Sequence, residues 1–154
     1  MVKTLVATDS SPVQFLIRLA LGVVIFPHGA QKVFGWFGGA GYGATVTAFS
    51  AIGFPFWAII LLMISEVFGS LLLVLGLFTR VWALAIGTAI AICLKMNHLQ
   101  HGFFMNWFGQ QQGEGYEYHI LVLGIAMALV LRGGGMLSWD RVLARDRRRG
   151  GILL

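Results

Sequence analysis

The sequence predicts an all-α integral membrane protein, a bundle of four transmembrane helices with both termini in the cytoplasm. Hydrophobic residues make up 58% of the 154-residue chain and charged residues 11%, with a mean hydropathy of +0.82. A soluble domain carries about 25% charged residues, so this chain could not cover a water-facing surface in the usual way. The apolar residues also gather in runs, and the run 54–78 exceeds the about 20 residues that cross a bilayer.

Hydropathy places four spans, at residues 12–34, 54–78, 81–99 and 118–131. Each should be an α-helix, because a single segment in lipid must satisfy its own backbone hydrogen bonds. The first is too long for a signal peptide and is interrupted by Arg18, so we expect it to stay attached. Between the first two spans, GWFGGAGYGA predicts a re-entrant or interfacial loop. Residues 1–140 would then form one transmembrane domain.

Positive charge sets the orientation. The basic residues on the side that holds both termini and the short middle loop are Lys3, Arg80, Arg132, Arg141, Arg145 and Arg147 to Arg149. The opposite side has Lys32 near a helix end and Lys95 deeper. The positive-inside rule therefore predicts a multi-pass protein of the cytoplasmic (inner) membrane, with the N- and C-termini inside.

Residues 141–154 form a basic cytoplasmic tail. The segment MLSWDRVLARDRRR, which leads into it, predicts a short amphipathic helix on the inner membrane surface, with arginines that can meet anionic lipid. The alternative is a docking site for a soluble cytoplasmic redox partner. Nucleic-acid binding is not expected, because membrane orientation accounts for most of the net charge of +5.

Glu66 is the only ionisable residue in the run 54–78. A carboxylate near the centre of a membrane helix costs at least ~2.5 kcal/mol, so it normally faces a partner, a cavity or the protein interior. Arg18 and Lys95 are the partners that the sequence suggests. Glu66 then either centres a polar site that moves protons or only fastens the bundle through an interhelical hydrogen bond.

Other ionisable residues gather in the outer half of the predicted bundle. They are His28, Lys32, Lys95, His98, His101, Glu117 and His119. For His28 and Lys95 we expect burial in a polar pocket with Glu66. For Lys32, His101 and Glu117, snorkelling to the interface is the simpler interpretation. Arg18 lies near the inner end of its span, where it could reach the headgroups in the same way.

The chain resembles the DoxX family of small four-helix bacterial and archaeal membrane proteins over roughly residues 15–140. The matching segments are RLALGVVIFPHGAQKVFGWFGG, Glu66 with Gly69, LGLFTR, HGFFMNW, EYHILVLGIAMALVL and GGGMLSWD. Two positions depart from the family pattern: Ser70 replaces the second of two glycines, and His119 replaces an apolar residue. His119 could add a ligand or a hydrogen-bond donor that the family does not share.

The resemblance implies an oxidoreductase, through a relation to small subunits of archaeal thiosulfate:quinone oxidoreductase or quinol oxidase. Other members of the family look like membrane-bound partners of redox-defence or metal-handling proteins, so the resemblance implies this role as well. The sequence has no flavin or nicotinamide fingerprint. Cys93 is the only cysteine, and an intramolecular dithiol relay needs two, so the sequence excludes such a relay. Any redox role must therefore use a membrane-dissolved carrier, a metal or a partner subunit.

Three functions remain open. In a quinone-linked oxidoreductase subunit, Glu66, His28 and Lys95 would be catalytic. The substrate-binding residues would be Lys32, His98, Trp36, Phe103, Phe104, Trp107, Glu117 and His119, with the aromatic rings as walls. The chain could instead be a non-catalytic anchor or assembly partner for a soluble redox enzyme. The third function is metal or haem binding by His98 and His101, which lie an i,i+3 step apart. Self-association into a homo-oligomer is compatible with all three.

Overall fold

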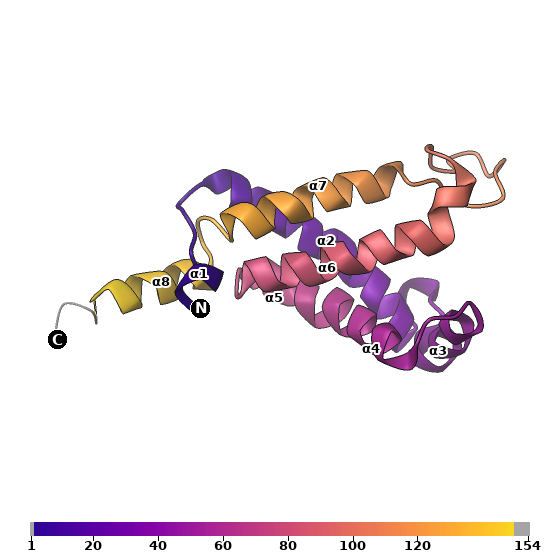
Figure 1. The fold of residues 1–154 in the computed structure, drawn as a ribbon, viewed down its shortest axis with the longest axis horizontal. Helices are drawn as coiled ribbons and strands as arrows, with labels where there is room; N and C mark the ends of the chain where they lie inside the picture. The colour runs from indigo at the N-terminus through magenta and orange to yellow at the C-terminus, as the bar shows by residue number, and fades with distance from the viewer. Residues whose placement is uncertain (1, 150–154) are drawn as a thin grey trace.

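The computed structural model describes residues 2–149, and this part of the chain is helical with no strand (Figure 1). In chain order its helices are α1 Val2–Leu5, α2 Pro12–Phe34, η1 Trp36–Gly38, α3 Gly41–Ala51, α4 Phe56–Ile64, η2 Ser65–Gly69, α5 Ser70–Leu75, α6 Thr79–Cys93, η3 Leu94–His98, η4 Leu99–His101, α7 Glu117–Arg132 and α8 Trp139–Arg149. Of these, η1 and η4 are 3₁₀ turns, whereas η2 and η3 are π-helical.

Three of the described helical segments are long and apolar enough to cross a membrane: Pro12–Phe34, Phe56–Leu75 and Thr79–His101. They correspond to the first three predicted spans. The second consists of α4, η2 and α5 without interruption, and the third of α6, η3 and η4. The predicted span 118–131 falls on α7, which has 16 residues and therefore rises about 24 Å.

Local signals set the ends of α2. The Ser11 side chain caps its first turn by accepting a hydrogen bond from the Val13 N–H at 3.1 Å, and Pro12 stands at the first helical position, where no N–H is needed. At the other end Gly35 has φ +71°, the left-handed conformation that glycine adopts without strain. The predicted first span and α2 share both bounds.

The helices pack around an apolar core in which α2, α5, α6 and α7 meet. Its buried members are Leu21, Ile25, Leu73, Ala83, Ile86, Ile90, Val122, Ala126 and Leu129. Many large apolar side chains point outward instead, among them Val13, Leu61, Phe68, Leu84 and Leu121. An apolar exterior around an apolar core is the arrangement expected of helices that face hydrocarbon.

At one end of the bundle, Arg18 and Asp140 hold several segments together. The Arg18 guanidinium is fully buried and donates hydrogen bonds to five backbone carbonyls, those of Leu73, Val74, Gly134, Met136 and Leu137. The Asp140 carboxylate accepts from the backbone N–H groups at the start of α6, at 2.7 and 2.9 Å. The expectation that Arg18 snorkels to headgroups is therefore wrong, because carbonyl oxygens inside the protein already solvate its charge.

The same end of the bundle holds α1 and α8, while α3 and the loop before α7 lie at the opposite end (Figure 1). An ion pair between Arg132 and Asp9, 3.0 Å apart, ties the end of α7 to the segment before α2. The Ser11 backbone N–H, together with the Arg132 guanidinium, lowers the pKa of the Asp9 carboxyl. The predicted amphipathic helix corresponds to α8, whereas residues 150–154 of the predicted tail lie outside the described residues.

The segment between the first two long helices differs from its prediction. It was expected to be a loop, but after the η1 turn it forms an 11-residue helix, α3. Three glycines with positive φ, Gly35, Gly38 and Gly41, precede or begin this helix, and a fourth, Gly53, follows it. The glycine-rich stretch thus marks the turn into α3, and the residues that follow it are compatible with a helix.

Candidate functional site

Two glycines on α2 let the second long helix approach closely. A Cβ at Gly22 would lie 2.7 Å from the Ser70 carbonyl oxygen, and one at Gly29 would lie 2.7 Å from the backbone carbon of Glu66. Small residues permit this contact between membrane helices. Lys32 follows Gly29 by three residues, so it lies on the same side of α2 and beside Glu66.

Glu66 and Lys32 form a buried ion pair. Their Oε2 and Nζ atoms are 2.8 Å apart, and the side chains expose 5% and 22% of their surface, respectively. Oε2 nevertheless has no hydrogen bond of acceptable angle, so the contact is chiefly one between charges. The interpretation of Lys32 as a snorkelling residue is therefore wrong, as is the choice of Arg18 or Lys95 as the partner of Glu66.

The backbone around Glu66 is π-helical. In the segment η2, the backbone hydrogen bonds follow the wider i→i+5 pattern. This pattern is rare in proteins, and where it occurs it is often at a functional site. The Ser70 hydroxyl donates to the Glu66 and Val67 carbonyl oxygens, at 2.5 and 2.9 Å, and so satisfies acceptors inside the bundle. The local backbone that presents Glu66 is thus supported by a buried side chain.

Tyr118 and His119, at the start of α7, carry further buried polar atoms. The Tyr118 ring is 6.2 Å from the His28 ring and 5.5 Å from the His119 ring, between centroids. The Tyr118 hydroxyl and the His119 Nδ1 are buried atoms without a hydrogen-bond partner. Such atoms are uncommon in proteins, and each calls for an explanation.

The other two residues predicted to be catalytic lie at the surface of the described chain. His28 and Lys95 are both exposed, and no described ion pair involves Lys95. The expectation that both are buried in one pocket with Glu66 is therefore wrong. The sequence did not show which face of its helix each of these two residues lies on.

The predicted aromatic walls do not enclose the ion pair. Trp36, Phe103, Phe104 and Trp107 are all exposed, with Trp107 exposing 80% of its surface. Trp36 packs on Phe34 at a centroid distance of 5.0 Å, and Phe103 packs on Phe104 and Tyr116 at 5.1 and 5.6 Å. Trp36, Phe103 and Phe104 therefore pack on neighbouring aromatic residues at the surface of the described structure.

Glu117 has a local structural contact. Its Oε1 atom accepts a hydrogen bond from the Met105 backbone N–H at 2.9 Å, and its own backbone N–H donates to the Phe103 carbonyl oxygen at 2.9 Å. Both contacts attach the loop to the start of α7. Glu117 is therefore neither a snorkelling residue nor a neighbour of the Lys32–Glu66 pair.

An apolar cavity of about 260 Å³ lies between the second and third long helices. It is lined by Phe54, Trp57, Ala58, Leu61, Leu62, Ser65, Ala85, Thr88, Ala89 and Ile92. Ser65 directly precedes Glu66, so the cavity reaches the π-helical segment. Phe54 and Trp57 supply aromatic walls that the sequence analysis did not select. Their position at the start of a long apolar run was the available signal, but many aromatic residues in this chain share it.

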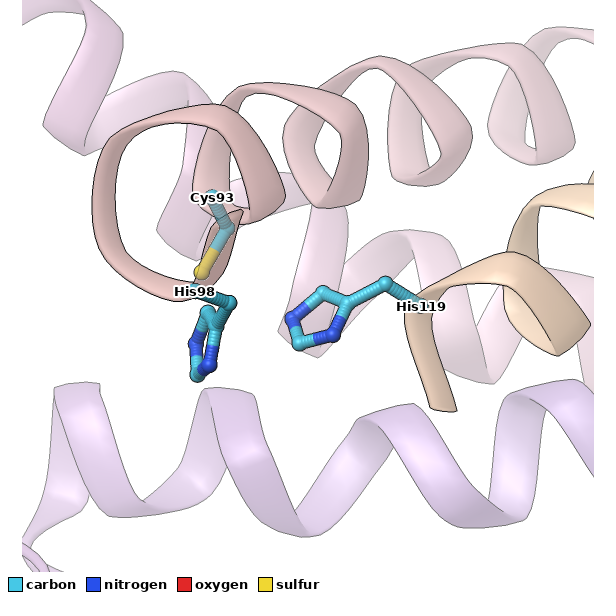
Figure 2. Close-up of side chains that lie close together, drawn as sticks. All are labelled: Cys93, His98 and His119. Carbon is cyan, nitrogen blue, oxygen red and sulfur yellow. The ribbon is translucent and has the colours of Figure 1, made fainter. Parts of the chain in front are cut away.

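His98 has different neighbours from those predicted. Cys93, His98 and His119 each offer one ligand atom, and these three atoms lie within 4.8 Å of one another (Figure 2). His101 is not in this group; its Nε2 lies 3.3 Å from the Gln100 side-chain nitrogen. The i,i+3 pairing of His98 with His101 is thus replaced by a group that includes Cys93.

Comparisons with known proteins agree with the helical fold. A family model described as DoxX matches residues 13–98, more than half of the chain. A relative from Bacillus subtilis (strain 168), named "Putative oxidoreductase CatD", is 26% identical over 142 residues, which cover 89% of this chain and 91% of the relative. No solved structure matches significantly. The matched range contains Lys32, Glu66, Cys93 and His98, whereas His119 lies beyond it.

Proposed function

Because the chain belongs to the DoxX family, we propose that it is a membrane subunit with a quinone-linked redox function and that its polar site is the Lys32–Glu66 pair. The name of the relative CatD describes it as an oxidoreductase, which supports the redox class. The observations that carry the proposal are the Lys32–Glu66 ion pair inside the bundle and the Tyr118 hydroxyl on α7, a buried polar atom without a hydrogen-bond partner.

A quinone head group matches this set of polar atoms. Its two oxygens accept hydrogen bonds, and the Lys32 ammonium and the Tyr118 hydroxyl are donors of that kind. Reduction of a quinone to a quinol takes up two electrons and two protons. The role of Glu66 would be to pass protons to the head group while Lys32 stabilises the charge that develops on the quinone oxygen.

The apolar cavity beside Ser65 supports a route for the ring and its tail. It has aromatic walls in Phe54 and Trp57 and opens among lipid-facing side chains such as Leu61. A lipid-soluble carrier needs an apolar slot of this kind close to a few polar groups. The electrons would come from or go to a partner protein, since the sequence has no flavin or nicotinamide fingerprint.

The orientation of the bundle is part of this proposal. We take α7 as a fourth span, because it packs along α6 over its length and a short helix can be accommodated by local thinning of the bilayer. The basic residues Arg80, Arg132, Arg141 and Arg145 lie toward the end that holds α1 and α8. The positive-inside rule then puts both termini in the cytoplasm and the Lys32–Glu66 pair toward the outer leaflet.

Quinone binding by the purified full-length protein in lipid nanodiscs tests the function. A short-chain quinone should bind and quench tryptophan fluorescence, and Lys32→Gln or Glu66→Gln should weaken the binding at least about tenfold, since each removes a charged hydrogen-bonding group. Lys95→Gln is the matched control, because it removes the same charge from an exposed position. Equal binding by all four proteins, or none by the wild type, would contradict the proposal.

The alternative is a non-catalytic anchor or assembly partner for a soluble redox enzyme. The observation that favours it is α8, an arginine-rich helix with Trp139 and Val142 exposed, which extends from the end of the bundle (Figure 1). Such a helix could lie on anionic lipid or bind a cytoplasmic protein. If the protein is an anchor, a redox enzyme should co-purify with it from native membranes, and removal of residues 144–154 should release that enzyme. The full-length protein should then bind no quinone.

A further inference from the structure

Cys93, His98 and His119 form a group of potential metal ligands beyond the Lys32–Glu66 pair. Their ligand atoms lie within 4.8 Å of one another. Figure 2 shows the Cys93 sulfur and the His98 ring on one helix, with the His119 ring extending toward them from α7. The two imidazole rings have centroids 4.2 Å apart. One thiol and two imidazoles from two helices therefore converge on a common point.

The π-helical segment η3 explains why Cys93 and His98 converge. They are five positions apart in the chain, and in a regular α-helix residues five positions apart point about 140° away from each other. In η3, Leu94–His98, the hydrogen-bond pattern widens to i→i+5, so that a residue five positions later comes round to nearly the same side. The widened turn brings the His98 side chain back over the Cys93 sulfur.

Two contacts prepare these side chains to act as ligands. The His98 Nδ1 lies 2.9 Å from the Glu114 carbonyl oxygen. A carbonyl oxygen can only accept, so Nδ1 carries the hydrogen and Nε2 of the neutral ring keeps its lone pair. The Asn97 side-chain amide donates to the Cys93 Sγ at 3.8 Å. In metal sites of proteins, hydrogen bonds of this kind to the ligating side chains hold them in the orientation that binds the metal.

His119 supplies an independent indication of a ligand. It is 4% exposed, and its buried Nδ1 has no hydrogen-bond partner. A buried imidazole nitrogen without a partner loses its hydrogen bond to water and gains none in return. Coordination to a metal would satisfy it, and the ring already faces the other two side chains (Figure 2).

We propose that Cys93, His98 and His119 bind one copper(I) ion. Thiolate sulfur selects soft ions such as copper(I) over magnesium, calcium or manganese, and imidazole suits copper as well. Charge favours copper(I) over zinc(II), because copper(I) with one thiolate is neutral whereas zinc(II) leaves a positive charge. A neutral assembly costs less free energy to hold in a low-dielectric bundle than a charged one. Binding releases the thiol proton to solvent.

This site goes beyond the quinone proposal and does not depend on it. Neither Lys32 nor Glu66 is one of the three ligands, and the copper test needs no quinone. Loss of quinone binding in Glu66→Gln would leave the copper proposal intact. Loss of copper binding in Cys93→Ser would likewise leave the Lys32–Glu66 proposal intact.

Copper(I) titration of the purified full-length protein in nanodiscs, under reducing anaerobic conditions against a chromogenic copper(I) chelator, tests the site. We expect one copper(I) per chain and an ultraviolet thiolate-to-metal absorption band. Cys93→Ser, His98→Gln and His119→Gln should each weaken binding at least about tenfold and lose or shift the band. Asn97→Ala should weaken it by about tenfold, as removal of a supporting partner does. His101→Gln should bind as the wild type does.

Melting temperatures in the absence of copper show which variants are folded. If His119→Gln fails to fold, Cys93→Ser and His98→Gln at less buried positions carry the test. The proposal is overturned if the wild type binds no copper(I), if folded Cys93→Ser protein keeps wild-type affinity, or if His101→Gln abolishes binding. A site that takes zinc(II) in preference to copper(I) in a competition titration would also overturn it.

Discussion

The side chains of Arg18 and Lys32, toward opposite ends of α2, place positive charge inside the bundle by different means. Arg18 is surrounded by carbonyl oxygens from the end of α5, where a helix carries partial negative charge, and from the segment that leads into α8. Lys32 is paired with a carboxylate that can exchange a proton. The planar guanidinium of Arg18 donates hydrogen bonds to five backbone carbonyls, whereas the Lys32 ammonium is a compact charge that contacts one carboxylate. We therefore assign Arg18 to structure and Lys32 to the candidate site.

Arg18→Lys should destabilise the protein although it keeps the charge. An ammonium on a shorter chain cannot reach five carbonyls, and each hydrogen bond to a charged group is worth about 1.5–3 kcal/mol. We expect the free energy of unfolding to fall by at least about 2 kcal/mol, measured by denaturation in one detergent. Arg132→Lys is the control, because its exposed pair with Asp9 should contribute less than about 1 kcal/mol. Equal effects of the two substitutions would refute the structural role of Arg18.

Glu66→Gln and Glu66→Leu should differ in melting temperature. The amide keeps hydrogen-bonding capacity, so Glu66→Gln should fold with a small loss. Glu66→Leu leaves the half-buried Lys32 without its carboxylate partner, which should cost up to about 3 kcal/mol, and adding Lys32→Leu should recover most of that loss. If Glu66 instead faced lipid, Glu66→Leu would raise the melting temperature, and we would abandon it as the centre of the site.

The sequence could predict the burial of Glu66 but not its partner. A lone carboxylate in a long apolar run must lie inside the bundle, which follows from the cost of charge in lipid. Lys32 was assigned to the interface because only its position near the end of the first helix was considered, without the helices that pack against it. Its pairing depends on Gly29, where α2 and the second long helix come into backbone contact. Contacts of this kind are set by packing between helices, which one sequence does not reveal.

At the scale of helices, the π-helical segments limited the prediction most. Regular α-helical spacing put His98 with His101 and did not select Cys93 as a ligand. In the structure η3 widens the turn and brings His98 back to Cys93 instead. The long spans were predictable because hydropathy averages over about 20 residues and tolerates such local changes. The direction of a single side chain, in contrast, changes with each such local change in the helix.

Gly29→Ala tests the close contact that positions the ion pair. Its added Cβ would lie 2.7 Å from the Glu66 backbone carbon and 2.8 Å from the Val67 nitrogen, so the helices must separate. Overpacking of this kind costs about 1–3 kcal/mol, and quinone binding should weaken with it. Gly124→Ala on α7 is the matched control, since its Cβ would meet nothing within 4 Å. That substitution should be neutral or stabilise the helix by up to about 1 kcal/mol. Equal losses in both variants would show that the Gly29 contact is not tight.

At the scale of the whole molecule, the bundle has chemically distinct ends. Arg18, Asp140 and the Arg132–Asp9 pair join the chain segments at the end that holds α1 and α8. The polar groups with exchangeable protons lie toward the other end, together with α3 and the loop before α7. A carrier entering from the membrane would therefore meet the proton-active groups near the end opposite α8, while the basic end remains free to contact lipid or a cytoplasmic protein.

The proposed orientation predicts which loops can be labelled from outside the cell. In a Cys93→Ser background, a cysteine at Gln111 in the loop before α7 should react with a membrane-impermeant thiol reagent in intact cells. A cysteine at Ser10, just before α2, should react only after the membrane is permeabilised. A cysteine at Arg145 in α8, which follows α7, should also react only after permeabilisation, so Gln111 and Arg145 together test whether α7 spans the membrane. Labelling of Gln111 and Arg145 from the same side would mean that α7 does not cross, and the reverse pattern at all three positions would mean that the termini face outward.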